Sequence, residues 1–300
     1  MNFWKSLFET DKNPTKGEAL HFKIFELFVV IFVLKYAWQW GPYIQQIGEV
    51  VLPLGIAQYV DVSFMFEHNI SLINAGLISI FALFGFFRVL PKYSYLITLG
   101  LFHLHYVSRF SLGEISHGSN FIGTSLLALA LALFFFNDDP VRRQRFTMGF
   151  IFFFFGLGYT SAAVSKLIGT GLTWPSGEHL WLWIAERSVD VSSSTGSFTP
   201  NAIQEWVLEY KFLGTLSLAF GLIAEFFGFL FWFDKTRPYI ATALIAMHFG
   251  VYFTMNIMFD VYIYELLIIG YPWARLIDQY LDLDKNPILA KTYDWSVKFA

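Results

Sequence analysis

The sequence predicts an all-α membrane protein, a polytopic bundle of about eight transmembrane helices. Three observations lead to this prediction. Hydrophobic residues make up 56% of the 300 residues and charged residues only 14%, whereas soluble proteins carry about 25% charged residues. Long apolar runs recur along the chain, and basic residues gather in alternate connections between them. A water-soluble chain of this size would need more charge to cover its surface, so the lipid bilayer is its expected surroundings.

The spans follow from the length of the apolar runs. A helix needs about 20 mostly apolar residues to cross a bilayer, with about 17 as a lower limit. The third, fourth and eighth of the predicted spans are short, and a tight turn at Asp260 makes the last two adjacent and antiparallel. The eight stretches are residues 20–40, 72–89, 95–110, 121–136, 147–167, 212–233, 239–258 and 261–277.

The connections predict the orientation of the chain. Fourteen of the 20 Lys and Arg residues lie in the tails and in every second connection, whereas the alternate connections carry only Arg187 and Lys211. Basic residues accumulate on the cytoplasmic side of membranes. Both termini are therefore expected in the cytoplasm, and an even number of spans satisfies every connection.

We expect a single membrane domain over residues 1–300, with cytoplasmic tails at about residues 1–19 and 278–300. The outer-face loop 168–210 is long enough to expect a function for it. It predicts a helix that begins near Ser176, a flexible link over residues 189–200 and a second short helix over residues 201–210. No removable signal peptide is expected, because the first 22 residues contain neither a long apolar run nor a small-residue cleavage site.

Several classes of function are disfavoured by composition. The chain has no cysteine, which excludes disulfides and thiolate metal sites. No basic patch is present, so nucleic acid is not an expected partner. His103 and His105 are two residues apart and face away from each other on a helix, whereas a helical metal pair needs a spacing of four. We therefore expect no metal site.

Ionisable residues inside the predicted spans are the best indicators of function, because they are costly in lipid and usually face the bundle interior. Lys166 either extends its amine to the headgroups or points inward beside the small residues at 161–163. Glu225 is expected to be neutral or paired with a group on another helix. Arg109, near the outer interface, either binds an anionic group or snorkels.

A second candidate is a polar stripe in the seventh span. His248, Tyr252 and Asn256 are spaced by four residues and share one face of a helix. The stripe is either an interhelical hydrogen-bond seam or part of a site. In both cases we expect it to face the interior, because polar groups that face lipid stay unsatisfied.

The fifth span and the loop after it carry a recognisable motif. Tyr159 is followed by Ala162-Ala163-Val164-Ser165-Lys166-Leu167, then by Trp174 and Gly177, and later by Glu225 and by Met247-His248, Asn256 and Phe259. This pattern, over roughly residues 95–270, resembles the HTTM family, which includes the vitamin K-dependent gamma-glutamyl carboxylases. Two positions depart from the family pattern, where Ala163 replaces a glycine and Ser165 replaces a second basic residue.

The resemblance implies a quinol-dependent enzyme. It places the base that deprotonates the reduced quinone, vitamin K hydroquinone or menaquinol, on Lys166. It places a second catalytic residue on His248 and, through a gapped alignment, a histidine of the outer connection on His117. The substrate- or quinone-binding residues would be Tyr159, Trp174, Glu225, Tyr252, Asn256, Arg109 and His117.

Three classes of function stay open. The first is quinol- and dioxygen-dependent carboxylation or epoxidation at the outer membrane face. The second is a non-catalytic membrane protein that binds lipid or quinone, or a subunit of a membrane complex. The animal carboxylases carry a large extramembrane domain after their spans that engages substrate propeptides, where this sequence has a short tail, so carboxylation of propeptide-bearing proteins is not an expected activity. A transporter ranks last, because no inverted repeat or pair of broken helices is visible.

The predicted orientation can be tested by reporter fusions. A reporter placed after Arg145 and one placed after Ser193 should report opposite sides of the membrane, because one predicted span separates the two positions. Fusions with the same sidedness would contradict the alternation of basic connections.

Overall fold

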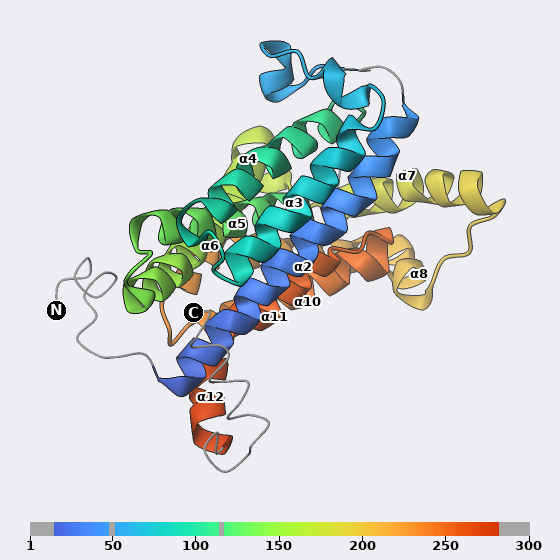
Figure 1. Cartoon of the computed structure of the whole chain (residues 1–300). Helices are drawn as coiled ribbons and strands as arrows, with labels where there is room; N and C mark the ends of the chain where they lie inside the picture. Colours follow the sequence, from blue (N-terminus) through green and yellow to red (C-terminus); the bar gives the residue numbers. More distant parts are fainter. Residues whose placement is uncertain (1–14, 48–51, 114–116, 282–300) are drawn as a thin grey trace. The chain divides into compact units, whose positions relative to one another are not determined.

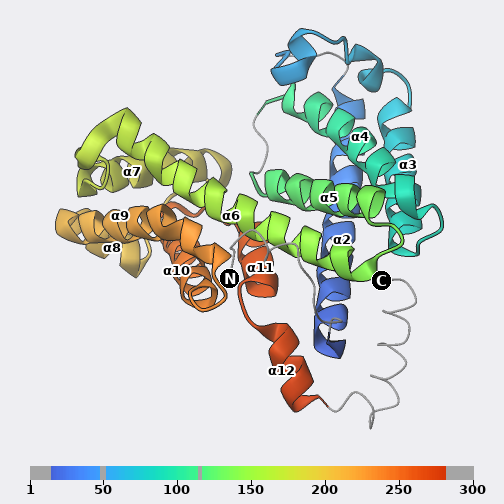
Figure 2. The ribbon, with the colours of Figure 1, turned by 90° about the vertical axis from the view of Figure 1, so that its left-hand side faces the viewer.

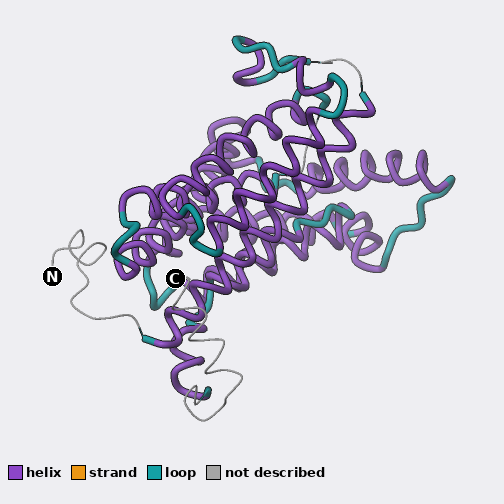
Figure 3. Tube along the Cα trace, in the orientation of Figure 1, coloured by secondary structure: helices purple, strands orange, loops and turns teal. Residues whose placement is uncertain are grey.

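Helices form all the regular structure in the part of the chain that the structure describes (Figures 1 and 3). The structure is a computed structural model, and it describes residues 15–47, 52–113 and 117–281. The helices are α2 (Lys16–Gln46), α3 (Ile70–Phe86), α4 (Pro91–Phe110), α5 (Gly118–Phe135), α6 (Pro140–Thr170), α7 (Gly177–Thr195), α8 (Ala202–Glu209), α9 (Lys211–Phe226), α10 (Arg237–Met255), α11 (Asp260–Ile269) and α12 (Trp273–Tyr280). Four 3₁₀ segments join them: η1 (Gly55–Gln58), η2 (Ser63–Phe66), η3 (Gly171–Thr173) and η4 (Phe227–Trp232).

Four of these elements are long and apolar enough to cross a membrane, by length and composition. They are α5, α6 with η3, α9 with η4, and α10, and α3 is a shorter apolar helix. The all-helical architecture is thus confirmed for the described residues, and the chain has the helices of a membrane protein. The count of eight spans stays a prediction, as do the cytoplasmic tails, which lie largely outside the described residues.

The predicted eighth span is not one continuous helix. α11 ends at Ile269 after 10 residues, and α12 begins only at Trp273. Pro272 lies in the break, and the residue before a proline is disfavoured in helical conformation. The apolar run 261–277 predicted one helix because hydropathy does not register this backbone constraint.

The chain divides into two units, Met1–Ile151 with Trp273–Ala300 and Phe152–Pro272, so α6 begins in the first and ends in the second. In the first unit α2 packs on α3, α3 on α4 and α4 on α5, while α12 lies against α2 (Figure 2). In the second unit α9 contacts α7, α8 and α10, and α10 contacts α11. The single domain expected over residues 1–300 is left as a prediction.

A buried carboxylate organises the first unit. Both oxygens of Glu26 accept hydrogen bonds, at 2.5 and 3.1 Å from Arg88 and at 2.8 Å from Lys23 Nζ. The hydroxyl of Tyr95 donates to the same carboxylate at 2.7 Å. Glu26 and Tyr95 are fully buried. The cluster thereby joins α2, the turn after α3 and the start of α4, and the sequence analysis did not single it out.

The loop 168–210 is mostly helical. The helix expected near Ser176 is α7, and Ser176 caps it by accepting a hydrogen bond from the backbone N–H of Glu178. α7 continues to Thr195, so the flexible link expected from residue 189 is wrong over its first half. Gly196, with φ of +84°, ends the helix in the left-handed conformation that glycine adopts without strain.

The second short helix, α8, is tied to the end of α10. It begins with a reciprocal cap between Asn201 and Gln204. The same two side chains donate to the backbone carbonyls of Phe253 at 2.8 Å and Thr254 at 2.9 Å. These carbonyls belong to the last turn of α10, where no helical donor follows. α8 therefore serves as the C-terminal cap of α10.

Removing the charge of Glu26 should destabilise the fold. Glu26→Gln keeps the volume but leaves Lys23 and Arg88 buried without their counter-charge, and the expected loss is about 3 kcal/mol of unfolding free energy. Glu67→Gln, at an exposed glutamate of the same unit, is the control and should change little. The measurement is thermal unfolding of both purified variants in one detergent, and equal melting temperatures would contradict the role given to Glu26.

Candidate functional site

The candidate site is built on α6, which places Tyr159 and Lys166 on one side. Seven residues correspond to two helical turns, so the two side chains share a face. Ala163 lies between them and is fully buried. Its small side chain lets neighbouring elements approach α6 closely, as the sequence analysis expected for this face.

Close backbone contact holds η4 against α6. A Cβ atom on Gly228 would lie 2.7 Å from Cβ of Tyr159, and one on Gly156 would lie 3.1 Å from the Gly228 carbonyl oxygen. Thr160 Oγ1 accepts a hydrogen bond from the backbone N–H of Phe229 at 2.9 Å, and its hydroxyl donates to the Phe226 carbonyl at 3.3 Å. The Thr160 hydroxyl of α6 thus forms hydrogen bonds with the backbone where α9 ends and the 3₁₀ segment η4 begins. This junction follows Glu225 by one residue.

Lys166 forms an ion pair with Glu225 of α9. The Glu225 side chain is 9% exposed and that of Lys166 is 30% exposed, so Lys166 is the more accessible partner of the pair. Nζ also lies 4.8 Å from the centre of the Trp174 ring, a cation–π contact. Of the two alternatives for Glu225, the structure shows the pairing with a group on another helix, and it places Trp174 beside Lys166.

A second polar pair lies deeper in the unit. Tyr159 Oη and His248 Nε2 are 2.8 Å apart and share a hydrogen bond between α6 and α10. Both side chains are buried, at 5% exposure each. The imidazole ring lies 5.2 Å from the ring centres of both Phe259 and Tyr262. His248 Nδ1 is buried and has no hydrogen-bond partner among the described residues.

The two pairs belong to one electrostatic neighbourhood. The charge of Lys166 acts on His248, and the charge of Glu225 acts on Tyr159. A basic amine, a carboxyl group, a phenol and an imidazole therefore come together from three helices in apolar surroundings. These are groups that can hold, donate or accept a proton.

α11 adds two residues that the sequence analysis missed. Tyr262 and Glu265 both interact electrostatically with Tyr159, and Glu265 is fully buried. Glu265 is an ionisable residue inside the predicted eighth span. The criterion that selected Lys166 and Glu225, an ionisable side chain within a span, would therefore have selected it as well. Tyr262 carries no comparable signal, because tyrosines are frequent at membrane interfaces.

The polar stripe of α10 does not face the interior. His248 is buried, but Tyr252 is 38% exposed and Asn256 is also exposed. Asn256 has φ of +54° and ends α10, so it lies on no helix face. The expectation of an inward stripe is wrong at these two positions. Asn256 lies beyond the last helical residue, where spacing by four no longer defines a face. Tyr252 lies within α10, on a side of the helix that the described residues leave partly uncovered.

Arg109 and His117 belong to the first unit, whereas Lys166, Glu225 and His248 belong to the second. The guanidinium of Arg109 is 4.4 Å from the centre of the Tyr43 ring and donates to the Gly113 carbonyl at 3.5 Å. His117 is exposed immediately before α5. The structure does not bring either residue together with Lys166 within one unit, and their roles as binding residues stay predictions, as do those of Tyr252 and Asn256.

Among residues 15–47, 52–113 and 117–281, no group of three His, Cys, Asp or Glu side chains is placed to hold a metal ion. No family model, no curated protein and no solved structure matches the chain. The class that the fold defines is a helical protein whose described residues include four helices long and apolar enough to cross a membrane.

The close contact at Gly228 predicts opposite effects for two glycine variants. Gly228→Ala should destabilise the protein by about 1–3 kcal/mol, because its methyl group would overlap Tyr159. Gly250→Ala in α10 meets no atom within 4 Å and should stabilise its helix by up to about 1 kcal/mol. Thermal unfolding of the two variants in one detergent measures both effects. A Gly228→Ala protein as stable as Gly250→Ala would refute the close packing of η4 on α6.

Proposed function

We propose that the protein is a multi-pass membrane enzyme that deprotonates a lipophilic reduced quinone, with Lys166 as the base. The observation that carries this proposal is the ion pair between Lys166 and Glu225 beside the buried hydrogen bond of Tyr159 and His248. The resemblance to the HTTM family extends the proposal to quinol- and dioxygen-dependent carboxylation or epoxidation. The proposed topology is eight spans with both termini in the cytoplasm.

The residues present fit a reduced quinone. The head of such a molecule is an aromatic ring with two hydroxyl groups, and it needs both a flat apolar surface and hydrogen-bond partners. The rings of Trp174 and Tyr262 provide aromatic surface, and His248 Nδ1 is a buried polar atom without a partner among the described residues. The Lys166 side chain is 30% exposed, so it is not sealed off from a ligand.

Glu225 gives Lys166 a way to act as a base. Only a neutral amine can accept a proton. A proton that shifts along the hydrogen bond from Lys166 Nζ to Glu225 leaves such an amine, and the apolar surroundings favour two neutral partners over separated charges. Nζ then accepts the proton of a quinol hydroxyl and becomes an ammonium ion, while Glu225 still holds the first proton. Glu225 passes that proton to a water molecule, which restores the ion pair of ammonium and carboxylate.

Tyr159 and His248 have a positioning role in this proposal. Their shared hydrogen bond fixes the orientation of the imidazole ring, and the rings of Phe259 and Tyr262 exclude water from it. The tautomer of His248 decides whether Nδ1 donates or accepts a hydrogen bond. A reduced quinone bound here would supply the acidic hydroxyl and, on oxidation by dioxygen, the reducing equivalents.

The alternative is a non-catalytic protein that binds lipid or quinone, or a subunit of a membrane complex. One observation favours it: an ion pair between two helices is also a purely structural solution to buried charge. In that case the charge of Lys166 matters and its ability to lose a proton does not.

Lys166→Arg separates the two functions. Arginine keeps the positive charge for Glu225 but does not deprotonate, so quinol-dependent dioxygen consumption should fall by about 100-fold or more. The assay uses purified protein with menaquinol or vitamin K hydroquinone, and thermal unfolding verifies that the variant is folded.

Lys211→Arg is the matched control, because Lys211 also pairs with a glutamate, Glu178 at 3.2 Å, on the exposed surface of the same unit. It should retain the wild-type rate. A wild-type rate in Lys166→Arg would refute the base assignment. A wild-type protein that consumes no dioxygen with either quinol would favour the non-catalytic alternative.

A further inference from the structure

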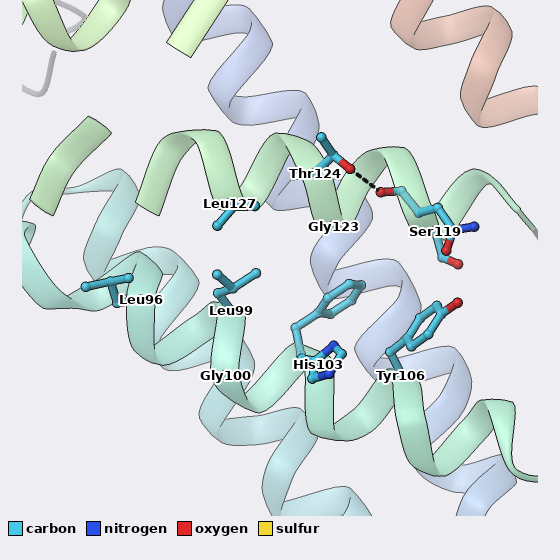
Figure 4. A pocket seen from close by; sticks show the side chains of 11 residues that line it. Leu96, Leu99, Gly100, His103, Tyr106, Ser119, Gly123, Thr124 and Leu127 are labelled. Carbon is cyan, nitrogen blue, oxygen red and sulfur yellow. Dashed lines mark hydrogen bonds between the residues drawn. The ribbon is translucent and has the colours of Figure 1, made fainter. Parts of the chain in front are cut away.

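A cavity of about 650 Å³ lies between α4 and α5, wholly within the first unit (Figure 4). This volume is within the range of small-molecule sites. The lining residues are Leu96, Leu99, Gly100, Phe102, His103, Tyr106, Ser119, Asn120, Gly123, Thr124 and Leu127. Neither the polar pairs around Lys166 nor any step proposed for them involves this cavity.

The lining of the cavity is divided into an apolar and a polar end. Leu96, Leu99 and Leu127 lie together at one end, and His103, Tyr106 and Ser119 lie at the other (Figure 4). The polar end is nearer the C-terminus of α4 and the N-terminus of α5. A molecule that fills the cavity therefore needs a polar head and an apolar chain, arranged along the helices.

Three polar side chains at this end lack hydrogen-bond partners within the described part of the chain. They are His103, Tyr106 and Asn120, of which His103 and Asn120 are exposed. His103 and Tyr106 lie in the predicted span 95–110, and Asn120 directly precedes the predicted span 121–136. Lipid tails offer no hydrogen bonds, and an unsatisfied polar group among them costs free energy. An occupant with its own donors and acceptors would satisfy them.

The charge and shape of the lining restrict the head of the occupant. None of the lining residues is Lys, Arg, Asp or Glu, so the cavity provides no counter-charge for a phosphate. The rings of His103 and Tyr106 are nearly parallel, at 9° with centres 6.3 Å apart, and add aromatic surface to the lining. This chemistry suits an uncharged head that carries hydroxyl or carbonyl oxygens.

We infer that the cavity between α4 and α5 binds a neutral lipid, with its oxygen-bearing head at His103, Tyr106 and Asn120 and its chain along the leucines. Two sources share this chemistry, an acylglycerol of the bilayer and a prenylated quinone. The site is separate from the proposed centre at Lys166, since it lies in the other unit and does not depend on a reaction.

The test is photolabelling of the full-length protein in phosphatidylcholine nanodiscs. The probe is a diacylglycerol with a diazirine in one acyl chain, and labelled peptides are mapped by mass spectrometry. Wild-type protein should be labelled in residues 96–127. Labelling spread evenly over the other apolar helices would overturn the inference.

Two glycines provide a matched pair of variants. A Cβ atom on Gly100, which lines the cavity, meets no atom within 4 Å, and neither does one on Gly76 of α3, which does not line it. Both Gly→Leu variants should fold, but only Gly100→Leu fills the cavity, so only its labelling should fall by about tenfold or more.

The polar end is tested by a third variant. Asn120→Leu should weaken labelling about fivefold, the factor for one net hydrogen bond. Wild-type labelling of Gly100→Leu would overturn the inference.

Competition distinguishes the two sources. Unlabelled diacylglycerol, menaquinone and phosphatidylglycerol are added at equal mole fractions. The stronger competitor of the first two identifies the occupant, and success of either supports the site. Strongest competition by the anionic phosphatidylglycerol, or none by any of the three, would contradict a neutral-lipid site. None of these readouts involves quinol oxidation, so they remain valid if the proposed enzymatic function fails.

Discussion

A polar group placed in an apolar helix must find its partner within the protein, and this constraint determines which helices meet. Glu26 satisfies it in the first unit by accepting hydrogen bonds from Lys23, Arg88 and Tyr95. Lys166 and Glu225 satisfy it in the second unit, across 59 residues of sequence. Apolar contacts between such helices are interchangeable with contacts to lipid tails, so they favour no particular neighbour. The few polar pairs therefore supply much of the specificity of each unit.

Features that depend on neighbouring residues could be predicted from the sequence, whereas polar pairs between distant segments could not. The start of α7 at Ser176 and of α8 at Asn201 follow from local caps, and Trp174 had to lie near Lys166 because few residues separate them. The pairing of Tyr159 with His248 needs the fold, since nothing in either segment indicates the other. The end of α10 was mispredicted because Asn256 adopts a left-handed conformation that hydropathy does not encode.

The candidate site combines two pairs with different degrees of burial. The Lys166 side chain is 30% exposed, whereas Tyr159 and His248 are almost completely enclosed. A reactive amine needs access to its substrate, and an orienting pair needs protection from competing water, so this gradient is compatible with catalysis. The same gradient is compatible with a non-catalytic binding site that has the charged Lys166 at its entrance. Whether Lys166 exchanges a proton, rather than where it lies, distinguishes catalysis from binding.

The segment 168–210 is anchored near both ends by side chains that contact other helices. Trp174 covers the Lys166 amine, while Asn201 and Gln204 satisfy the last carbonyls of α10. Loops on protein surfaces usually accept insertions and deletions during evolution. Here a deletion that removed α8 would leave two carbonyls of a neighbouring helix, those of Phe253 and Thr254, without these donors. Changes of length in this loop should therefore concentrate in the short stretch 196–200, so that related sequences would vary there and keep the spacing on either side.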